Sequence, residues 1–260
     1  MRTATEVSDA LREASNAGRR VSVDDLDLSG LDRILEHEAG DLTCTVEAGL
    51  RLSTLQAALA PHGQRLSLDP PGDPTIGACI GCDLAGPISH RYGRMRDLLL
   101  GVTVVLGDGL VANSGGKVVK NVAGYDFGKL LCGSRGTLGV IVRASLRLHP
   151  TPETSATLVA STGSEEAALE KRRAILRSQL VPSALDVTAE RLAVMFEASP
   201  RAVAAQMEAA RALVGGADAR DDVWTEVRER PRSGSEAPSP AVAALLGRIR
   251  AELDPTGTLA

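Results

Sequence analysis

The chain has 260 residues, of which 43% are hydrophobic and 24% are charged, as expected for a globular protein with one large or two small domains. A net charge of -4 suggests neither a nucleic-acid surface nor an anionic membrane surface, and no apolar run approaches the ~18 residues of a transmembrane helix. The acidic, amphipathic N-terminus lacks the apolar core of a secretory signal, so we expect a cytoplasmic protein.

The first part of the chain predicts alternating helices and strands that end in a loop-rich region. Apolar residues on one face predict the first helix, and alternating residues followed by glycine predict the first long strand. In chain order the predicted elements are a helix over 5–18, a short strand over 21–23, a turn or short helix over 28–35, a strand over 41–48, a helix over 53–60 and a loop-rich region over 66–87.

The second part predicts further strands and then mainly helices. The predicted elements are a strand over 98–106, a turn over 107–109 leading into 110–112, a glycine-rich stretch over 117–139, a strand over 140–148, an extended segment over 151–160, helices over 165–180 and 200–213, a linker over 228–240 and a final helix over 241–253. This order favours an α+β body up to about residue 150, to which we expect the last helix to return.

Four cysteines occur, and two of them form the motif Cys79-Ile80-Gly81-Cys82. The spacing fits a redox pair or half of a zinc site, but the histidines supply no second ligand pair at matching spacing. We therefore favour reduced thiols that pack a glycine-rich turn, and we expect no metal site.

Two glycine-rich stretches, residues 70–86 and 114–139, are candidates for ligand-binding loops. Glycine is needed where backbone lies against a ligand with no Cβ in the way, and converging N–H groups can hold a diphosphate. The glycines at 133, 136 and 139 do not have Rossmann spacing and precede a strand, while Gly115-Gly116-Lys117 lacks the rest of a P-loop. From spacing alone, ligand-binding loops and purely structural turns both remain open.

A longer set of motifs resembles the PCMH-type FAD-binding domain of the vanillyl-alcohol oxidase family. The motifs are GGK at 115–117, KNVAGYD at 120–126, GSRGTLGVI at 133–141, TIGACIGCDLAGP at 75–87 and RYGRMRDLLLGV at 91–102. The phrase KNVAGYD is similar to the smaller FAD-binding subunit of glycolate oxidases. The resemblance covers about residues 40–150 well and the termini loosely.

The resemblance implies a fold class of α+β, with FAD held non-covalently between two α+β subdomains and covered by a cap. It implies a flavin and ribityl site formed by Thr75, Ile76, Gly77, Ala78, Gly81 and Cys82, and backbone contacts to the adenine end from Gly139, Val140 and Ile141. It also implies that Lys117, Lys120, Asn121 and Tyr125 border the isoalloxazine or support its loop. No catalytic residue can be nominated, because the pair His90-Arg91 fits a solvent-facing loop better.

The same resemblance divides the chain into a FAD-binding PCMH-type domain over 1–150, a shortened α/β cap segment over 151–230, and a linker with a C-terminal helix over 231–260. The family's first phosphate loop is missing after residue 23, where the carboxylates Asp24, Asp25 and Asp27 follow instead. A like charge near a diphosphate costs about 1 kcal/mol per close pair, so this change weakens diphosphate binding. The loss of the family's first phosphate loop also excludes a covalent flavin link through a histidine of that loop. A further acid, Asp83, is expected near the cofactor.

The resemblance implies an oxidoreductase subunit that oxidises a small 2-hydroxy acid by hydride transfer to flavin. Its implied partners are a larger flavin subunit and an iron–sulfur subunit, with no nucleic acid. A second hypothesis is a degenerate, flavin-poor structural partner of such a complex, and a third is a thiol-redox protein that uses Cys79 and Cys82.

Overall fold

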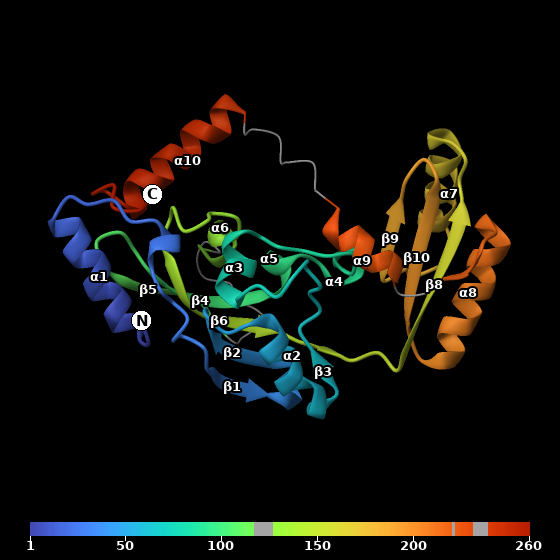
Figure 1. Ribbon diagram of the computed structural model, residues 1–260, viewed down its shortest axis with the longest axis horizontal. Coiled ribbons are helices and arrows are strands. Elements are labelled where there is room, and N and C mark those ends of the chain that lie inside the picture. Colours follow the sequence, from blue (N-terminus) through green and yellow to red (C-terminus); the bar gives the residue numbers. More distant parts are fainter. Residues whose placement is uncertain (117–126, 220–221, 231–238) are drawn as a thin grey trace.

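The computed structural model describes residues 1–116, 127–219, 222–230 and 239–260, and these contain two larger antiparallel sheets and one short two-stranded pair (Figure 1). The larger sheet lies in the body of the molecule, and the smaller one lies at the far end of its long axis. In the described ranges, no helix has the length and apolar character needed to span a membrane.

The body sheet has five strands in the order β1-β2-β6-β4-β5, with all neighbours antiparallel. The strands are β1 (Ile34–Glu38), β2 (Thr43–Glu47), β4 (Leu99–Val105), β5 (Val111–Gly115) and β6 (Val140–Arg147). The short pair β3 (Gln64–Arg65) and β7 (His149–Pro150) lies beside it. Because strand residues alternate between faces, Val46, Val102 and Ala144 all enter one buried core.

Short helices cover that apolar face of the sheet and contribute to the same core. They are α2 (Leu52–Leu59), α3 (Ile76–Gly81), α5 (Met95–Leu98) and α6 (Phe127–Leu131). The opposite sheet face is polar at its centre, where Thr45 and Ser145 hydrogen bond at 3.0 Å. The longer α1 (Ala4–Asn16) packs its buried Val7 and Leu11 into a second core cluster with β4 and β6.

The C-terminal segment packs back on the body. Helix α10 (Pro240–Leu253) places Ile249 and Leu253 against the main core. The buried carboxylate of Asp254 then accepts hydrogen bonds from the backbone N–H groups of Thr258 and Leu259 at 2.9 and 2.8 Å. This turn lets Leu259 form a parallel β-bridge with Val21, so the end of the described chain lies beside its first loop.

The smaller sheet has the order β11-β8-β10-β9 and is covered by helices on both faces. Its strands are β8 (Thr154–Ser161), β9 (Ala184–Val187), β10 (Arg191–Ala198) and β11 (Ala217–Ala219). Helices α7 (Glu165–Arg177) and α8 (Pro200–Val214) pack on one face. On the other face lie α9 (Asp222–Glu229) and the short α4 (Ser89–Tyr92) of the body.

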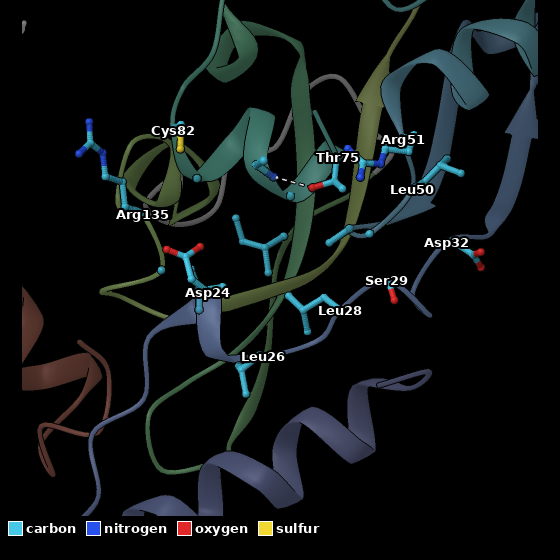
Figure 2. Close-up of a pocket in the computed structure, with 18 of the residues that line it drawn as sticks. Asp24, Leu26, Leu28, Ser29, Asp32, Leu50, Arg51, Thr75, Cys82 and Arg135 are labelled. Atoms are coloured by element: carbon cyan, nitrogen blue, oxygen red, sulfur yellow. Dashed lines mark hydrogen bonds between the residues drawn. The ribbon is translucent and has the colours of Figure 1, made fainter. Parts of the chain in front are cut away.

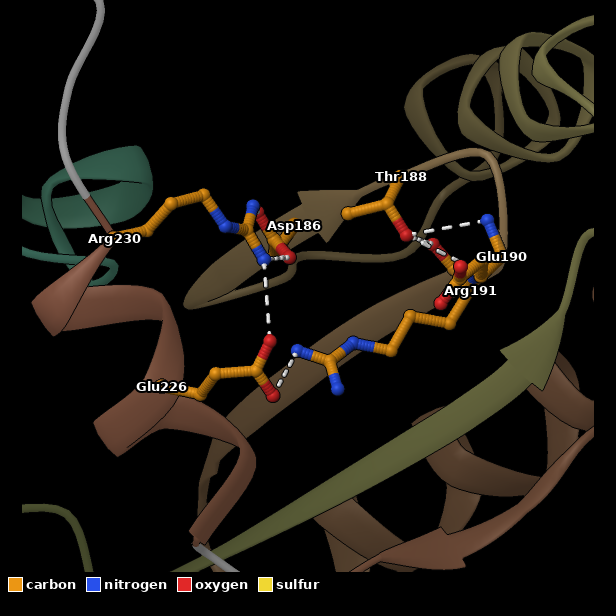
Figure 3. Close-up of polar contacts among 6 residues, drawn as sticks. All are labelled: Asp186, Thr188, Glu190, Arg191, Glu226 and Arg230. Carbon is orange, nitrogen blue, oxygen red and sulfur yellow. Dashed lines mark hydrogen bonds and ion pairs between the residues drawn. The ribbon is translucent and has the colours of Figure 1, made fainter.

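Helix α9 is fixed to this sheet by a buried aromatic side chain and by ion pairs. Trp224 is 2% exposed and donates its indole N–H to Thr157 at 2.8 Å. Arg230 forms two bonds to Asp186, and Arg191 pairs with Glu226 at 2.9 Å (Figure 3). The alternating charges give each guanidinium a carboxylate partner, so α9 and the sheet form one unit.

A buried ion pair joins the body to the part of the molecule that contains the smaller sheet. Arg65 of β3 donates two hydrogen bonds to Glu197 of β10, at 2.8 and 2.7 Å, and Glu197 is 5% exposed. Burial alone would raise the pKa of Glu197, but the bonds from Arg65 outweigh it and lower the pKa. Arg91 of α4 adds a bond to the backbone carbonyl of Glu197 at 2.7 Å. The smaller sheet is therefore docked against the body by paired, desolvated charge.

Most predicted elements are present, with four corrections. The loop-rich region contains α3, because Thr75 caps a helix that glycine content alone disfavours, and α4 follows that region. The apolar residues near Ile34 form β1 rather than a helix, since pairing with β2 decides their conformation. Residues 21–23 form a single bridge followed by a 3-10 turn, not a strand. The predicted linker starts too early, because α9 runs to Glu229, and residues 231–238 lie outside the described ranges.

We expect Asp69 to make stability depend on pH. The pKa of Asp69 is raised to about 6, because burial raises it by more than the ion pair with Arg228 at 3.3 Å lowers it. A carboxyl that holds its proton more tightly when folded adds stability that is complete below about pH 4 and lost as the pH rises through 6. The unfolding free energy of the wild type, relative to Asp69→Asn, should fall by roughly 1–3 kcal/mol over that range. Urea unfolding at pH 4 to 7 measures it, with the exposed pair member Asp218→Asn as control. Parallel pH curves for wild type and Asp69→Asn would contradict it.

Candidate functional site

A cleft of about 670 Å³ opens in the body between α3 and the segment that follows α1. Four stretches of backbone line it: residues 23–32, the turn after β2, helix α3, and the loop that leads into β6. The lining residues are Val23, Asp24, Leu26, Leu28, Ser29, Asp32, Ala48, Gly49, Leu50, Arg51, Thr54, Thr75, Gly77, Ala78, Gly81, Cys82, Arg135, Gly136, Gly139 and Ile141.

Helix α3 forms the wall that faces residues 23–32 (Figure 2). Its N-cap Thr75 has extended backbone, and the Thr75 hydroxyl accepts a hydrogen bond from Ala78 N–H at 3.2 Å. This bond satisfies one of the donors that a helix N-terminus leaves without an intrahelical partner. The Thr75 hydroxyl thereby caps α3 within the wall of the cleft, which fixes where this helix begins.

Backbone hydrogen bonds at both ends of α3 connect the walls of the cleft. At its start, Gly77 N–H donates to the carbonyl of Ala48 at 2.7 Å. At its end, Arg135 N–H donates to the carbonyl of Gly81 at 2.8 Å. The two glycine-rich stretches therefore lie side by side within the described residues, and the turn after β2 joins them.

Two glycines allow residues 23–32 to approach the other walls closely. A Cβ at Gly49 would lie 2.2 Å from the carbonyl oxygen of Leu28, and one at Gly136 would lie 2.8 Å from Cβ of Val23. Gly136 also has φ of +82°, which L side chains rarely adopt. Gly81 differs, because the nearest atom to an added Cβ there is 3.9 Å away. The missing side chain at Gly81 leaves space inside the cleft.

The walls are mostly apolar, and four charged side chains lie along them. Leu26, Leu28, Leu50 and Ile141 supply apolar surface. The charged groups are Asp24, Asp32, Arg51 and Arg135. Such a site suits a flat, largely apolar ring system with a polar tail.

Seven of the nine residues proposed from the sequence line this cleft. They are Thr75, Gly77, Ala78, Gly81, Cys82, Gly139 and Ile141. The other two, Ile76 and Val140, are fully buried in core clusters and are not among the lining residues. Lys117, Lys120, Asn121 and Tyr125 lie outside the described residues.

Asp83 and Arg91 have environments that differ from those expected, whereas Cys79 is a buried, reduced thiol as expected. Asp83 does not line the cleft and instead pairs with Arg94 at 2.9 Å. The two thiols of the Cys79–Cys82 motif are separated, since Cys82 is exposed in the cleft whereas Cys79 lies in the core, where burial raises its pKa to about 12. A thiolate at Cys79 is thus disfavoured at neutral pH, which argues against thiol-redox chemistry. Arg91 is exposed, but it lies on α4 rather than in a loop, and it donates to the backbone carbonyl of Glu197 at 2.7 Å.

Two lining residues carry no signal that sequence reasoning could have used. Asp32 and Arg51 stand in segments without glycine clusters or a known motif, and they reach the cleft only through the close packing around Gly49. The spacing of Gly136 and Gly139 did mark that loop. In the described part of the chain, no group of three or more histidine, cysteine, aspartate or glutamate side chains could hold a metal ion.

Residues 25–115 match the FAD binding domain family. The chain is 35% identical over 219 residues to "Glycolate oxidase subunit GlcE" of Escherichia coli (strain K12), a match that covers 82% of this chain and 60% of that protein. It is 35% identical over 158 residues to "Glycolate oxidase subunit GlcD" of Bacillus subtilis (strain 168), covering 60% and 34%. The chain thus spans less than two thirds of these relatives.

Other matches extend the comparison. A D-lactate dehydrogenase of Archaeoglobus fulgidus (strain ATCC 49558 / DSM 4304 / JCM 9628 / NBRC 100126 / VC-16) is 41% identical over 119 residues, which is 45% of this chain and 26% of that protein. Among solved structures, an alkyldihydroxyacetonephosphate synthase has the same fold, with a TM-score of 0.69 at 17% identity, over 88% of this chain and 53% of that one.

The two cleft glycines should respond differently to alanine. Gly49→Ala forces a methyl group against two backbone carbonyls, so it should destabilise the fold by about 1–3 kcal/mol. Gly81→Ala meets no atom closer than 3.9 Å and lies in a helix, so it should leave stability unchanged or raise it by up to about 1 kcal/mol. Thermal and urea unfolding of both variants measures this. Equal destabilisation would mean that the space beside Gly81 is absent.

Proposed function

We propose that this chain, which belongs to the PCMH-type FAD-binding proteins, holds FAD non-covalently in the cleft beside α3 and forms part of an oxidoreductase for small 2-hydroxy acids. The family match and the FAD-linked relatives support FAD as the cofactor. The observation that carries the cleft assignment is its construction from both glycine-rich stretches, tied together through the ends of α3.

The residues of the cleft fit the ring systems of this cofactor. Gly81 leaves space that a Cβ would fill, and Leu50, Ala48 and Ile141 offer apolar surface against which a flat ring can pack. The guanidinium groups of Arg51 and Arg135 are donors suited to phosphate oxygens. When bound, FAD would accept the hydride, which carries two electrons, that a 2-hydroxy acid loses from its C2 on oxidation to the keto acid, and the hydroxyl proton would leave separately.

The protein's own contribution is to position the ligand and exclude water. The Thr75 cap and the bond from Gly77 to Ala48 fix where α3 begins in the wall of the cleft. Residues 23–32 close the cleft from the opposite side with Leu26 and Leu28. All lining residues fall between Val23 and Ile141, so the smaller sheet takes no part in this cleft.

The substrate class and the partner also belong to the proposal. Relatives include two glycolate oxidase subunits and a D-lactate dehydrogenase, and glycolate and D-lactate are both small 2-hydroxy acids. Because two relatives are called subunits, we propose that this chain works beside a larger flavin subunit. An iron–sulfur subunit is a further proposed partner, on the resemblance of the sequence alone.

A second candidate function is a structural subunit that keeps the fold and binds little flavin. The observation that favours it is the turn over Val23–Asp25, which stands where the family has a phosphate loop and brings Asp24 into the cleft. Binding experiments separate the two candidates.

We expect purified protein to bind FAD, and Gly81→Ala to weaken that binding about tenfold, since one methyl group in a filled site costs about 1–3 kcal/mol. Flavin fluorescence titration measures the dissociation constants. Gly247→Ala, a glycine of α10 with no neighbour within 4 Å, is the matched control and should bind FAD like the wild type. FAD bound with equal affinity by all three proteins would rule out this cleft, and no binding at all would favour the structural subunit.

With FAD bound, anaerobic addition of glycolate or D-lactate should bleach the flavin absorbance near about 450 nm, because the cofactor is reduced. The chain alone and the chain with a larger flavin subunit should both be measured, with acetate, which lacks the 2-hydroxyl, as control. Bleaching that requires the second subunit would still support the substrate class. Bleaching by neither hydroxy acid in either preparation would contradict it.

A further inference from the structure

The charges that line the cleft cancel. Among its lining residues, two are arginines, Arg51 and Arg135, and two are aspartates, Asp24 and Asp32, while the rest are uncharged. A diphosphate carries negative charge, so a cleft with formal net charge of zero gives it no long-range attraction. Which part of a flavin nucleotide the cleft prefers therefore depends on how each carboxylate is placed.

Three neighbouring acids in the segment before the cleft have different surroundings. Asp25 accepts a hydrogen bond from Ser22 N–H at 2.9 Å, and Asp27 accepts two from Ser29. The carboxylate of Asp24 has neither an ion pair nor a hydrogen bond within the described part of the chain. Asp24 is also the one of these three that lines the cleft, and Figure 2 shows its carboxylate directed toward the space below α3.

The backbone opposite Asp24 offers little to offset this charge. The N–H of Gly77 is bonded to Ala48, that of Ala78 to the Thr75 hydroxyl and that of Gly139 to the carbonyl of Gly136. These donors are used inside the walls and are not available to phosphate oxygens. Arg51 likewise donates one of its N–H groups to the carbonyl of Asp73 at 2.7 Å.

On the basis of the function proposed above, we propose that Asp24 is a specificity-determining residue that disfavours the phosphate groups of a flavin nucleotide. The cleft then holds the ring system through apolar contacts, while the unpaired carboxylate reduces the advantage that phosphates add. The preference of the chain for FAD and FMN over riboflavin is therefore smaller than it would be in the same cleft without this charge.

The test replaces the carboxylate with its neutral isostere and compares ligands that differ in phosphate content. Dissociation constants of riboflavin, FMN and FAD are measured by flavin fluorescence for the wild type and Asp24→Asn. Asp25→Asn is the matched control, because it removes the same charge one residue away from the cleft and its amide can still accept from Ser22. Low and 1 M salt are compared.

We expect Asp24→Asn to lower the dissociation constant of FAD about fivefold, the effect of one close like-charge pair in water, and to leave riboflavin unchanged. Asp25→Asn should have a smaller effect on FAD. In 1 M salt, where the screening length falls to about 3 Å, the gain of Asp24→Asn should shrink.

Other results overturn the inference in distinguishable ways. If Asp24→Asn binds FAD no better than the wild type, or gains equally for riboflavin, the carboxylate does not oppose phosphates, while the proposed function stands. If Asp24→Asn binds FAD more weakly, the carboxylate accepts hydrogen bonds from the ligand instead. If neither protein binds any flavin, the proposed function fails and the inference fails with it.

Discussion

The cleft depends on the backbone hydrogen bonds that hold the two ends of α3. A helix of six residues is too short to be stable alone, so α3 exists because its surroundings complete it. Thr75 caps it, Gly77 donates to the turn after β2, and Gly81 accepts from Arg135. The bonds of Gly77 and Gly81 join α3 to two different stretches of the wall. Gly77 suits this close approach, because a Cβ there would lie 3.0 Å from the carbonyl oxygen of Ala48, whereas Gly81 has space for one.

The molecule separates ligand positioning from the attachment of its smaller sheet. The cleft is formed by body residues between Val23 and Ile141. The smaller sheet contacts the body elsewhere, through the buried pair of Arg65 and Glu197 and the apolar cluster around Trp224. A buried, bidentate ion pair requires one geometry, because a charge that loses its partner stays desolvated and unpaired. The smaller sheet is therefore held in one orientation without shaping the cleft walls.

The regular elements could be predicted from the sequence wherever local pattern and tertiary packing agree. The alternation in β6 and the apolar stripe of α1 are examples, since the residues that suggest the element also bury it. Prediction failed for β1, whose apolar spacing also fits a helix, and for α3, whose glycines disfavour the helix that its neighbours stabilise. For α3 the deciding contacts come from residues distant in the sequence, whereas β1 is decided by its pairing with the next strand along the chain.

The same reason limits prediction of the site. Thr75, Gly77 and Gly139 could be proposed because resemblance and glycine content marked their loops. Ile76 and Val140 share those loops, yet their side chains point into the core, which a motif does not reveal. Asp32 and Arg51 carry no local signal, because only the approach of two backbones at Gly49 brings them to the cleft.

The pairing of Val21 with the C-terminal segment bears on how the molecule is made. Val21 immediately precedes the residues that close the cleft, and its N–H and carbonyl bond to Thr258 and Ala260. During synthesis on a ribosome, the body strands leave the exit tunnel long before residues 254–260 do. The cleft wall accordingly lacks this support until those residues emerge, so we expect stable capture of a ligand to require residues 254–260.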